Sequence, residues 1–460
     1  MSPSNQYMTT TALIVALGGF LMGFDASVIS GVIRFVEAEF ELSPMQVGWV
    51  VSSLSLTATL GMLASGPLSD RLGRRPVLQI AAVLFAVSAI ASAVAPDYFT
   101  LVVARMLGGF GVGAALIVAP MYIAEMAPPA SRGRFMSFNQ LNIVVGISAA
   151  FFSNYLILTL GESGGAWSEA LRLGEWNWRW MLGIEALPAV AYLLALSLVP
   201  ESPRWLAMRG RDAEATEVLG RVAGAGATAV LREVKESIVA EARLGKASWR
   251  ALRHPSLRLV MVIGIVIGIL QQVSGINAVF FYAPMIFEKS GIGTNAAFMQ
   301  AALVGLVNLV FTVVAMAVID RFGRRPLLVL GLSGIAACML LLAWGFSTGD
   351  GANPRLILFA ILGFVASFAV SLGPVMWVLF SELFPNRVRG VAISFVGLVN
   401  SATAFVVTLV FPWQLQSLGS STTFLIYAVF ALAGLAFVMG ALPETKGRSL
   451  EELETVLVKG

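Results

Sequence analysis

Long apolar stretches alternate with short polar segments along almost the whole chain. About twelve of these stretches reach roughly 20 residues, the length that a helix needs to cross a bilayer. They lie near residues 8–33, 46–69, 76–95, 99–126, 134–159, 178–199, 258–287, 295–319, 326–347, 355–384, 390–416 and 421–442. Inside lipid a backbone must satisfy its own hydrogen bonds, so each stretch is predicted to be a helix. The pattern therefore predicts an all-α membrane protein with twelve transmembrane helices.

One long hydrophilic interval interrupts this pattern, from residue 201 to about residue 258. Its apolar positions recur with helical spacing over residues 213–222 and 228–241, which predicts short amphipathic helices. We therefore predict four parts: an N-terminal six-helix bundle at 1–200, a cytoplasmic helical linker at 201–257, a C-terminal six-helix bundle at 258–442 and a cytoplasmic tail at 443–460.

A polar motif between apolar stretches occurs twice. Residues 70–75 read DRLGRR and residues 320–325 read DRFGRR. A second pair of residues follows each copy in the same order and with the same spacing: Glu125 with Arg132, and Glu382 with Arg389. Self-similarity at so long a period indicates two related halves. In membrane proteins such halves usually meet around a substrate path near the middle of the bilayer.

Composition and charge support this picture and add an orientation. The chain is 58% hydrophobic and 12% charged, and its mean hydropathy is +0.84. If the N-terminus is cytoplasmic, the inner loops and tail hold 24 of the 30 lysines and arginines, which predicts that both termini are cytoplasmic. The net charge of +4 reflects this asymmetry and does not indicate nucleic-acid binding. No cleavable signal peptide is evident, because the first apolar stretch is too long and contains Asp25.

Residues for enzyme chemistry are scarce. His254 is the single histidine and Cys338 the single cysteine, so a metal cluster or a nucleophile with a histidine base cannot be assembled from them. Residues 109–113 read GFGVG, but this run lies inside an apolar stretch and no Lys-Ser or Lys-Thr pair follows it. We interpret these glycines as a close approach of helices. We expect no catalytic residues, no metal site and no cofactor.

Ionisable residues inside the apolar stretches all fall in the first half: Asp25, Arg105 and Glu185. A charge at such depth costs several kcal/mol unless it is paired or faces water, so these side chains should meet in the protein interior. Intramembrane charges often mark ion or proton paths. The alternative interpretation is a purely structural pair between Asp25 and Arg105.

The second half carries a different set of polar residues, which is uncharged and rich in amides. Its members are Gln271, Gln272, Asn277, Asn308, Trp377 and Asn400, and Gln140 adds an amide from the fifth stretch. Amides both donate and accept hydrogen bonds, and an indole offers an apolar face, which suits a neutral polyhydroxyl ring. On a straight helix Asn277 would point away from Gln271, but unwinding at Ser274 and Gly275 could turn both toward one cavity. Each amide alone could also form an interhelical hydrogen bond.

Three further motifs carry a family resemblance that covers essentially the whole chain. Residues 200–204 read PESPR, residues 443–447 read PETKG and residues 271–277 read QQVSGIN. Together with the repeated motif, they resemble the signatures of the sugar porter family of the major facilitator superfamily. The resemblance implies the major facilitator fold, with a cytoplasmic helical insert between the halves.

The resemblance also implies roles for particular residues. The seven polar residues Gln140, Gln271, Gln272, Asn277, Asn308, Trp377 and Asn400 match sugar-binding positions of the family. Phe281 and Tyr282 belong to the same expected pocket, and Phe281 stands where a tyrosine is common. Asp25 matches the proton-coupling carboxylate of bacterial symporters and Arg105 matches its basic partner. Glu185 matches an acidic residue of some symporters.

A cytoplasmic gate is the expected role of the duplicated motifs. Its expected members are Asp70, Arg74, Glu125, Arg132, Glu201, Arg204, Asp320, Arg324, Glu382 and Arg389. By resemblance, such networks hold the halves together on the inside while the outside is open. Exposed ion pairs each contribute only about 0 to 1 kcal/mol, so a network of them can hold one state without trapping it. For Arg71, Arg75, Arg321 and Arg325, fixing the topology alone is an equal alternative.

These observations predict a secondary active transporter of the cell membrane that imports a neutral pentose or hexose by proton symport, through alternating access. The proton is the coupling ion, and the chain is expected to act as a monomer in the bilayer, with no obligate protein partner. A passive sugar facilitator, a polyol or inositol symporter, and a drug exporter of the same superfamily remain open alternatives. A membrane sensor or a membrane-bound enzyme is disfavoured.

Overall fold

Helices dominate the computed structural model, which describes residues 3–128, 131–244, 252–348, 353–385 and 388–446. No β-strand occurs within these ranges. Among the described residues, twelve helical segments are long and apolar enough to cross a membrane. This confirms the predicted number of spans and the all-α class, and it identifies a multi-pass membrane protein.

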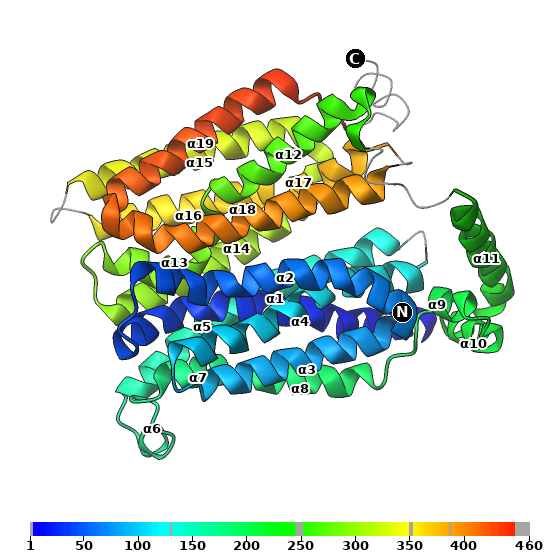
Figure 1. Cartoon of the computed structure of the whole chain (residues 1–460), viewed down its shortest axis with the longest axis horizontal. Coiled ribbons are helices and arrows are strands. Elements are labelled where there is room, and N and C mark those ends of the chain that lie inside the picture. Colours follow the sequence, from blue (N-terminus) through cyan, green and yellow to red (C-terminus); the bar gives the residue numbers. More distant parts are fainter. Residues whose placement is uncertain (1–2, 129–130, 245–251, 349–352, 386–387, 447–460) are drawn as a thin grey trace. The chain divides into compact units, whose positions relative to one another are not determined.

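The first six spans begin at the N-terminus (Figure 1). They are formed by α1 (Pro3–Glu39), α2 (Pro44–Leu72), α3 (Arg74–Ala93), α4 (Tyr98–Met126), α5 (Arg132–Glu162), and α7 (Asn177–Gly183) with α8 (Ala186–Leu196). A short helix, α6 (Ala166–Ala170), lies between the fifth and sixth spans. The hydrophilic interval forms α9 (Pro203–Met208), α10 (Asp212–Ala223), η1 (Gly224–Gly226) and α11 (Ala227–Leu244). Both amphipathic helices predicted in this interval are therefore present.

The second six spans follow a short 3-10 helix, η3 (Pro255–Leu257). They are formed by α12 (Arg258–Val273) with α13 (Ile276–Glu288), α14 (Thr294–Phe322), α15 (Arg324–Ser347), α16 (Pro354–Val370) with α17 (Leu372–Leu383), α18 (Arg389–Ser417) and α19 (Gly419–Ala441). Residues 447–460, which include most of the predicted tail, lie outside the described residues.

Two of the spans are interrupted close to a proline. Pro188 lacks the amide hydrogen that would bond to Ile184, and the helix is interrupted between α7 and α8. Pro374 likewise cannot bond to Val370, and α16 ends there. Glu185 lies at this first interruption, immediately before α8, and its side chain is buried.

Two compact units make up the chain. The first comprises Met1–Val28, Ser53–Ala150 and Glu175–Lys246. Within it α3 packs against α4, α7 and α8, as Figure 1 shows. Tyr122 and Tyr192 are fully buried there, and their hydroxyls donate to the carbonyls of Pro200 and Val15. The first bond ties α4 to the segment between α8 and α9, and the second ties α8 to α1.

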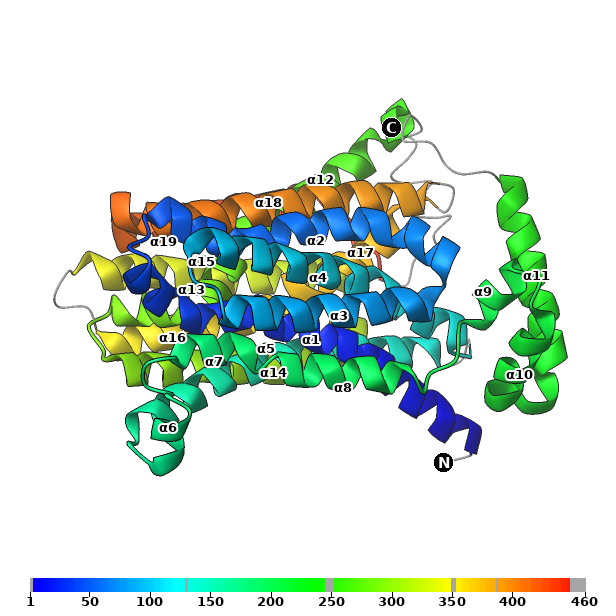
Figure 2. The same cartoon turned by 60° about the horizontal axis from the view of Figure 1, so that its bottom comes forward.

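Helices α9, α10 and α11 belong to this first unit and form a cluster of their own (Figure 2). The indole of Trp205 on α9 donates a hydrogen bond to the carbonyl of Asp70 at 3.1 Å. The guanidinium of Arg209 lies over the Trp205 ring, 5.4 Å from its centroid. The helical insert is thus attached directly to the first copy of the repeated motif.

The second unit comprises Ile29–Ser52, Phe151–Gly174 and Ala247–Gly460. Within it α15 packs against α16 and α19, and α12 packs against α18. This unit also contains the end of α1, the start of α2 and the end of α5. Three helices of the first sequence half therefore complete a compact unit built mainly from the second half.

Candidate functional site

Asp25 on α1 and Arg105 on α4 form an ion pair in the interior of the first unit. The Arg105 guanidinium donates one hydrogen bond to the Asp25 carboxylate and a second, at 3.1 Å, to the Asp25 backbone carbonyl. Each side chain is only 1% exposed. Among the described residues, Asp25 Oδ2 and Arg105 Nε have no hydrogen-bond partner. One carboxylate oxygen is thus buried without the full set of bonds that a carboxylate normally makes.

Two neighbours shape this buried pair. A side chain at Gly108 on α4 would bring its Cβ within 2.6 Å of Asp25 Oδ2, so the absence of one leaves room for the carboxylate. Glu185 is also buried and interacts electrostatically with both Asp25 and Arg105. Its Oε1 has no hydrogen-bond partner in the described part of the chain. Two acids and one base therefore share the site, and the three charges come together as the sequence led us to expect.

The seventh span is broken where the sequence predicts unwinding. Helix α12 ends at Val273 and α13 begins at Ile276. Gly275 between them has φ 90° and ψ 10°, a left-handed conformation that glycine adopts without strain. The break turns Asn277 back toward α12, and its amide donates to Gln272 Oε1 at 2.7 Å.

An amide network in the second unit is built around this break. Asn400 on α18 donates to Gln271 Oε1 at 2.8 Å and to the Gly268 carbonyl at 2.8 Å. Its own Oδ1 accepts from Gln272 Nε2 at 3.2 Å. Four amides (Gln271, Gln272, Asn277 and Asn400) are thereby linked, all of them buried or half-buried. A neutral donor-and-acceptor surface of this kind can exchange its internal bonds for bonds to a hydroxylated ligand.

The first copy of the repeated motif forms a network inside the first unit. Arg74 donates to both oxygens of Glu125, at 3.0 and 2.9 Å, and to Asp70 at 3.1 Å. The Ser202 hydroxyl donates to the same Glu125 carboxylate. The carboxylate of Glu201 accepts from the backbone amides of Arg74 and Arg75 and so caps the start of α3. The preceding Gly73 has φ 108°.

The second copy repeats this network inside the second unit. Arg324 donates to both oxygens of Glu382, at 3.2 and 2.8 Å, and the Thr445 hydroxyl donates to Glu382 at 2.7 Å. Glu444 accepts from the amides of Arg324 and Arg325, each at 3.0 Å, and caps α15. Gly323, which precedes α15, has φ 90°, and its counterpart Gly73 likewise has a positive φ. The duplication in the sequence is therefore a duplication of contacts.

Comparison with known proteins agrees with this architecture. The family model described as "Sugar (and other) transporter" matches residues 11–457. The chain is 40% identical over 463 residues to the arabinose-proton symporter of Bacillus subtilis (strain 168), covering 100% of this chain and 97% of that protein. It is 36% identical over 444 residues to the D-xylose transporter of Levilactobacillus brevis, covering 96% and 94% of the two chains. The chain belongs to the sugar transporter family.

The fold of this chain is also similar to that of a solved transporter structure. The inward open conformation of the xylose transporter XylE from E. coli superposes with a TM-score of 0.85 at 35% identity, and 98% of this chain and 100% of that chain are covered. The predicted major facilitator fold and the prediction of a transporter rather than an enzyme are both confirmed.

The remaining expected sugar-binding residues are not joined to the amide network by hydrogen bonds within the described ranges. The Tyr282 hydroxyl donates instead to the Thr408 carbonyl at 3.0 Å, and Phe281 is buried in α13. Asn308 is buried on α14, whereas Trp377 on α17 is 46% exposed. Gln140 lies on α5 in the first unit, and its side chain is exposed.

Three expected gate residues make other contacts or lie apart. Arg389 donates to the Phe384 carbonyl at 3.1 Å, and Arg204 donates to the Ser237 hydroxyl at 3.3 Å. No hydrogen bond or ion pair of Arg132 appears in the described part of the transporter. The side chain of Asp320 lies outside the described residues. A cytoplasmic gate that holds the two halves together remains a prediction, because each observed network lies within a single unit.

Some residues of the networks were missed from the sequence. Ser202 and Thr445 complete the two carboxylate sites, and Glu444 is the counterpart of Glu201. A signal was present, because PES and PET occupy matching places after the sixth and twelfth spans. An alignment of the two halves would have assigned these residues the same contacts.

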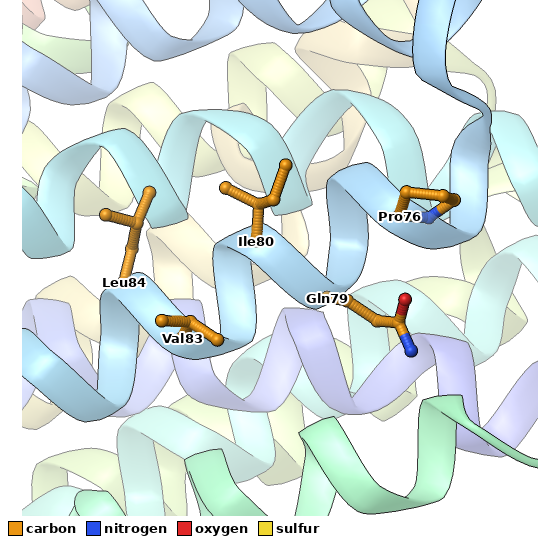
Figure 3. A pocket seen from close by; sticks show the side chains of 5 residues that line it. All are labelled: Pro76, Gln79, Ile80, Val83 and Leu84. Carbon is orange, nitrogen blue, oxygen red and sulfur yellow. The ribbon is translucent and has the colours of Figure 1, made fainter.

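A shallow hollow on α3 is unrelated to this chemistry. Its lining residues, shown in Figure 3, are Pro76, Gln79, Ile80, Val83 and Leu84. All five lie on one helix, and Ile80 and Val83 are exposed apolar side chains. In a membrane-spanning helix such a surface is suited to lipid contact rather than to sugar binding.

Proposed function

We propose that this transporter imports a neutral monosaccharide together with a proton. The observation that carries the proposal is the buried pair of Asp25 and Arg105 with Glu185 beside it. Ionisable groups at this depth are costly and are typical of proton paths. The names of relatives support the same reading, since one is an arabinose-proton symporter and another is the D-xylose-proton symporter of Escherichia coli (strain K12).

Protonation of Asp25 is the proposed coupling step. The ionised carboxylate binds Arg105 through a charge-assisted hydrogen bond, and the neutral acid binds it much less strongly. A proton on Asp25 therefore frees α1 to move relative to α4. Glu185 lies close enough to influence which acid holds the proton, because two nearby carboxylates resist being ionised together.

The amide network is the proposed sugar site. Gln271, Gln272, Asn277 and Asn400 offer several donors and acceptors without charge, and their present bonds to one another can be replaced by bonds to sugar hydroxyls. By family resemblance, Gln140, Asn308, Trp377, Phe281 and Tyr282 contribute further contacts. Pentoses and hexoses are the proposed class, since relatives named for arabinose, xylose and glucose all match this chain.

Alternating access, a cytoplasmic position of both termini and a monomeric state complete the proposal. The excess of lysine and arginine on one side supports the orientation. The predicted parts at 1–200, 201–257, 258–442 and 443–460 are the moving halves, the linker and the tail. The networks around Glu125 and Glu382 lie at the proposed cytoplasmic ends, where they are placed to act as the gate.

Reconstituted protein tests both coupling and substrate. Purified transporter in liposomes is given one radiolabelled pentose and a panel of unlabelled pentoses, hexoses and polyols, with and without an inward proton gradient. We expect accumulation that requires the gradient, disappears with a protonophore and is competed by a subset of monosaccharides. A potential of 100 mV moving one proton per sugar supports roughly 50-fold accumulation.

Other outcomes would overturn the proposal. Uptake that equilibrates without accumulating, and that a protonophore leaves unchanged, would identify a passive facilitator. Competition by organic cations but not by sugars would identify an exporter of another substrate class.

A further inference from the structure

The buried face of α3 changes from apolar to polar partway along the helix. Two serines, Ser88 and Ser92, lie on the later part of this face and are 3% and 1% exposed. They are one helical turn apart, so their hydroxyls lie on the same side of α3. The earlier part, between the repeated motif and Ser88, buries only apolar side chains: Val77, Leu78, Ala81, Ala82, Phe85 and Ala86. The polar part of the face is therefore nearer the end of α3 that the charge asymmetry predicts to be extracellular.

Ser88 and the carboxylate of Asp25 face the same glycine of α4. A Cβ at Gly108 would lie 2.6 Å from Asp25 Oδ2 and 2.6 Å from Ser88 Oγ. Helices α3 and α4 pack along one another, and all three residues belong to the first unit. Because residue 108 has no side chain, a hydroxyl of α3 comes close to the acid of α1.

The Asp25 oxygen on this side is the one that Arg105 does not bind. Arg105 donates to Oδ1, and Oδ2 has no hydrogen-bond partner among the described residues. The Ser88 hydroxyl is therefore near Oδ2 without bonding to it directly. Across such a separation one water molecule can donate to the carboxylate and accept from the hydroxyl. Ser92 Oγ also has no partner in the described part of the chain, so it can bind water in the same way.

The charged residues that act on Asp25 in this interior come from other helices. Arg105 lies on α4, and Glu185 lies at the start of α8 with its Oε1 unpartnered among the described atoms. Helix α3 itself has no ionisable side chain after Arg75. At its outer end, Arg179 of α7 donates to the carbonyls of Ala93 and Ala95 at 3.1 and 2.8 Å. Within the buried face of α3, hydroxyls are thus the groups that can pass a proton.

We propose that Ser88 is a relay residue for the coupling proton and that Ser92 continues the same path toward the outside. This inference deepens the proposed proton symport and rests on it. In the relay, the bridging water gives one proton to Asp25 Oδ2 and takes one from the Ser88 hydroxyl, which takes one from the side of Ser92. Asp25 gains one proton, and the water and the serine end as they began. The apolar residues before Ser88 offer no such step, so the α3 path serves the outer side.

Sugar-induced alkalinisation tests the relay separately from sugar movement. Purified transporter in liposomes receives arabinose, xylose or glucose in a weakly buffered suspension, and the initial rise in external pH measures proton entry. Counterflow of the same labelled sugar, at equal pH on both sides, is measured on the same preparation. Counterflow requires only the exchange of sugar, so it does not depend on proton delivery.

Substitution of the hydroxyls supplies the variants. Ser88→Ala should lower the initial rate of alkalinisation by about tenfold or more, because a hydrogen bond to a charged group contributes at least such a factor. Ser88→Ala combined with Ser92→Ala should lower the rate further. Ser88→Thr keeps a hydroxyl and should restore most of the rate. Counterflow should stay close to that of the parent in all three.

Ser65→Ala is the matched control. Ser65 on α2 belongs to the same unit and is also 3% exposed, and its hydroxyl donates to the Gly61 carbonyl of its own helix. This variant should leave both alkalinisation and counterflow unchanged.

Two results would overturn the relay. One is alkalinisation that is unchanged in both Ser88→Ala and the double variant, although the parent shows it. The other is counterflow that falls as much as alkalinisation, which would mean that Ser88 acts only in packing. A parent that shows counterflow but no alkalinisation would instead contradict the proposed symport, and the relay with it. A failure of the relay alone is thus distinguished from a failure of proton coupling.

Discussion

The two units share a scaffold and differ in what they hold inside it. In each unit an arginine of the repeated motif binds a glutamate bidentately, a hydroxyl completes the carboxylate, and a second glutamate caps the next helix. The interiors differ: the first buries Asp25, Arg105 and Glu185, whereas the second links amides around Asn400. Duplication has kept the contacts of the repeated motif and changed the polar residues within the spans.

Under the proposed function, the two interiors have different tasks. Buried charges respond to a proton by changing their mutual attraction, whereas amides respond to a ligand by exchanging hydrogen bonds at constant charge. Coupling and recognition can then be altered separately by substitution. The predictions below test that separation, beginning with the largest expected effect.

Loss of the buried base should have the largest effect. Arg105→Gln leaves Asp25 buried without its cation, and breaking such a pair destabilises proteins by about 3 to 5 kcal/mol. We expect a large drop in the thermal unfolding temperature in detergent. The double variant Asp25→Asn with Arg105→Gln removes both charges and should recover most of it. Equal destabilisation of the single and double variants would argue against a charge effect.

Substitution of Asn400, the central amide of the network, should have the second largest effect, which is on sugar recognition. Asn400→Ala removes bonds to Gln271, Gln272 and the Gly268 carbonyl, which corresponds to about 1 to 3 kcal/mol, or about 5- to 150-fold in sugar affinity. The accumulation ratio at saturating sugar should stay close to that of the parent. Thr403→Ala on the same helix removes a hydroxyl that donates to the Val399 carbonyl, and this control variant should keep the sugar affinity of the parent. Unchanged affinity of Asn400→Ala in a binding titration would remove the amide network from the sugar site.

The two glutamates that bind the arginines of the repeated motif, Glu125 and Glu382, should respond alike, with a smaller effect. Glu125→Gln and Glu382→Gln each weaken a bidentate arginine contact, by about 1 to 2 kcal/mol. The Glu125 variant should lose slightly more stability, because Arg74 is 4% exposed and Arg324 is 12% exposed. Thermal unfolding of the two variants side by side measures this, and an effect confined to one copy would break the proposed equivalence.

The two helix-capping glutamates should differ in their dependence on pH, and this is the smallest effect. Burial raises the pKa of Glu201 above its usual 4.5, although backbone hydrogen bonds oppose the change. At Glu444, partial burial raises the pKa, but hydrogen bonds from the amides of Lys446, Arg324 and Arg325 outweigh it, and the pKa falls below 4.5.

The signs of the two contributions to stability are therefore opposite. The contribution of Glu444 is present above pH 4.5 and is lost as the pH falls through its lowered pKa. The contribution of Glu201 is present below pH 4.5 and is lost as the pH rises through its raised pKa. Relative to the parent, the Glu444→Gln variant should therefore be least stable near neutral pH. The Glu201→Gln variant should be most stable there. The differences should stay below about 1 kcal/mol because both sites contact solvent. Parallel pH profiles of unfolding would contradict this.

Apolar periodicity was sufficient to predict the spans and the amphipathic helices of the insert, because a bilayer allows few alternatives to a helix of fixed length. The break at Gly275 was also predictable, since on a straight helix Asn277 would point away from Gln271. Contacts between residues far apart in sequence could not be predicted in this way. The pairing of Arg34 with Glu288 depends on how two helix ends approach each other, and nothing in the local sequence of either residue specifies its partner.

Interior charges were an intermediate case. The cost of burial predicted that Asp25 and Arg105 would meet, because an isolated charge in the membrane interior is unstable. Burial could not predict that the Tyr282 hydroxyl would bond to the Thr408 carbonyl, since a tyrosine hydroxyl can be satisfied by any nearby acceptor.

The central claim, that Asp25 couples sugar movement to protons, is tested most directly by Asp25→Asn in liposomes. Accumulation driven by an inward proton gradient and counterflow of labelled sugar without a gradient are measured on the same preparation, with the exposed Glu41→Gln as a matched acid-to-amide control. We predict that Asp25→Asn loses accumulation and retains counterflow, while Glu41→Gln retains both. Undiminished gradient-driven accumulation by Asp25→Asn would contradict the account.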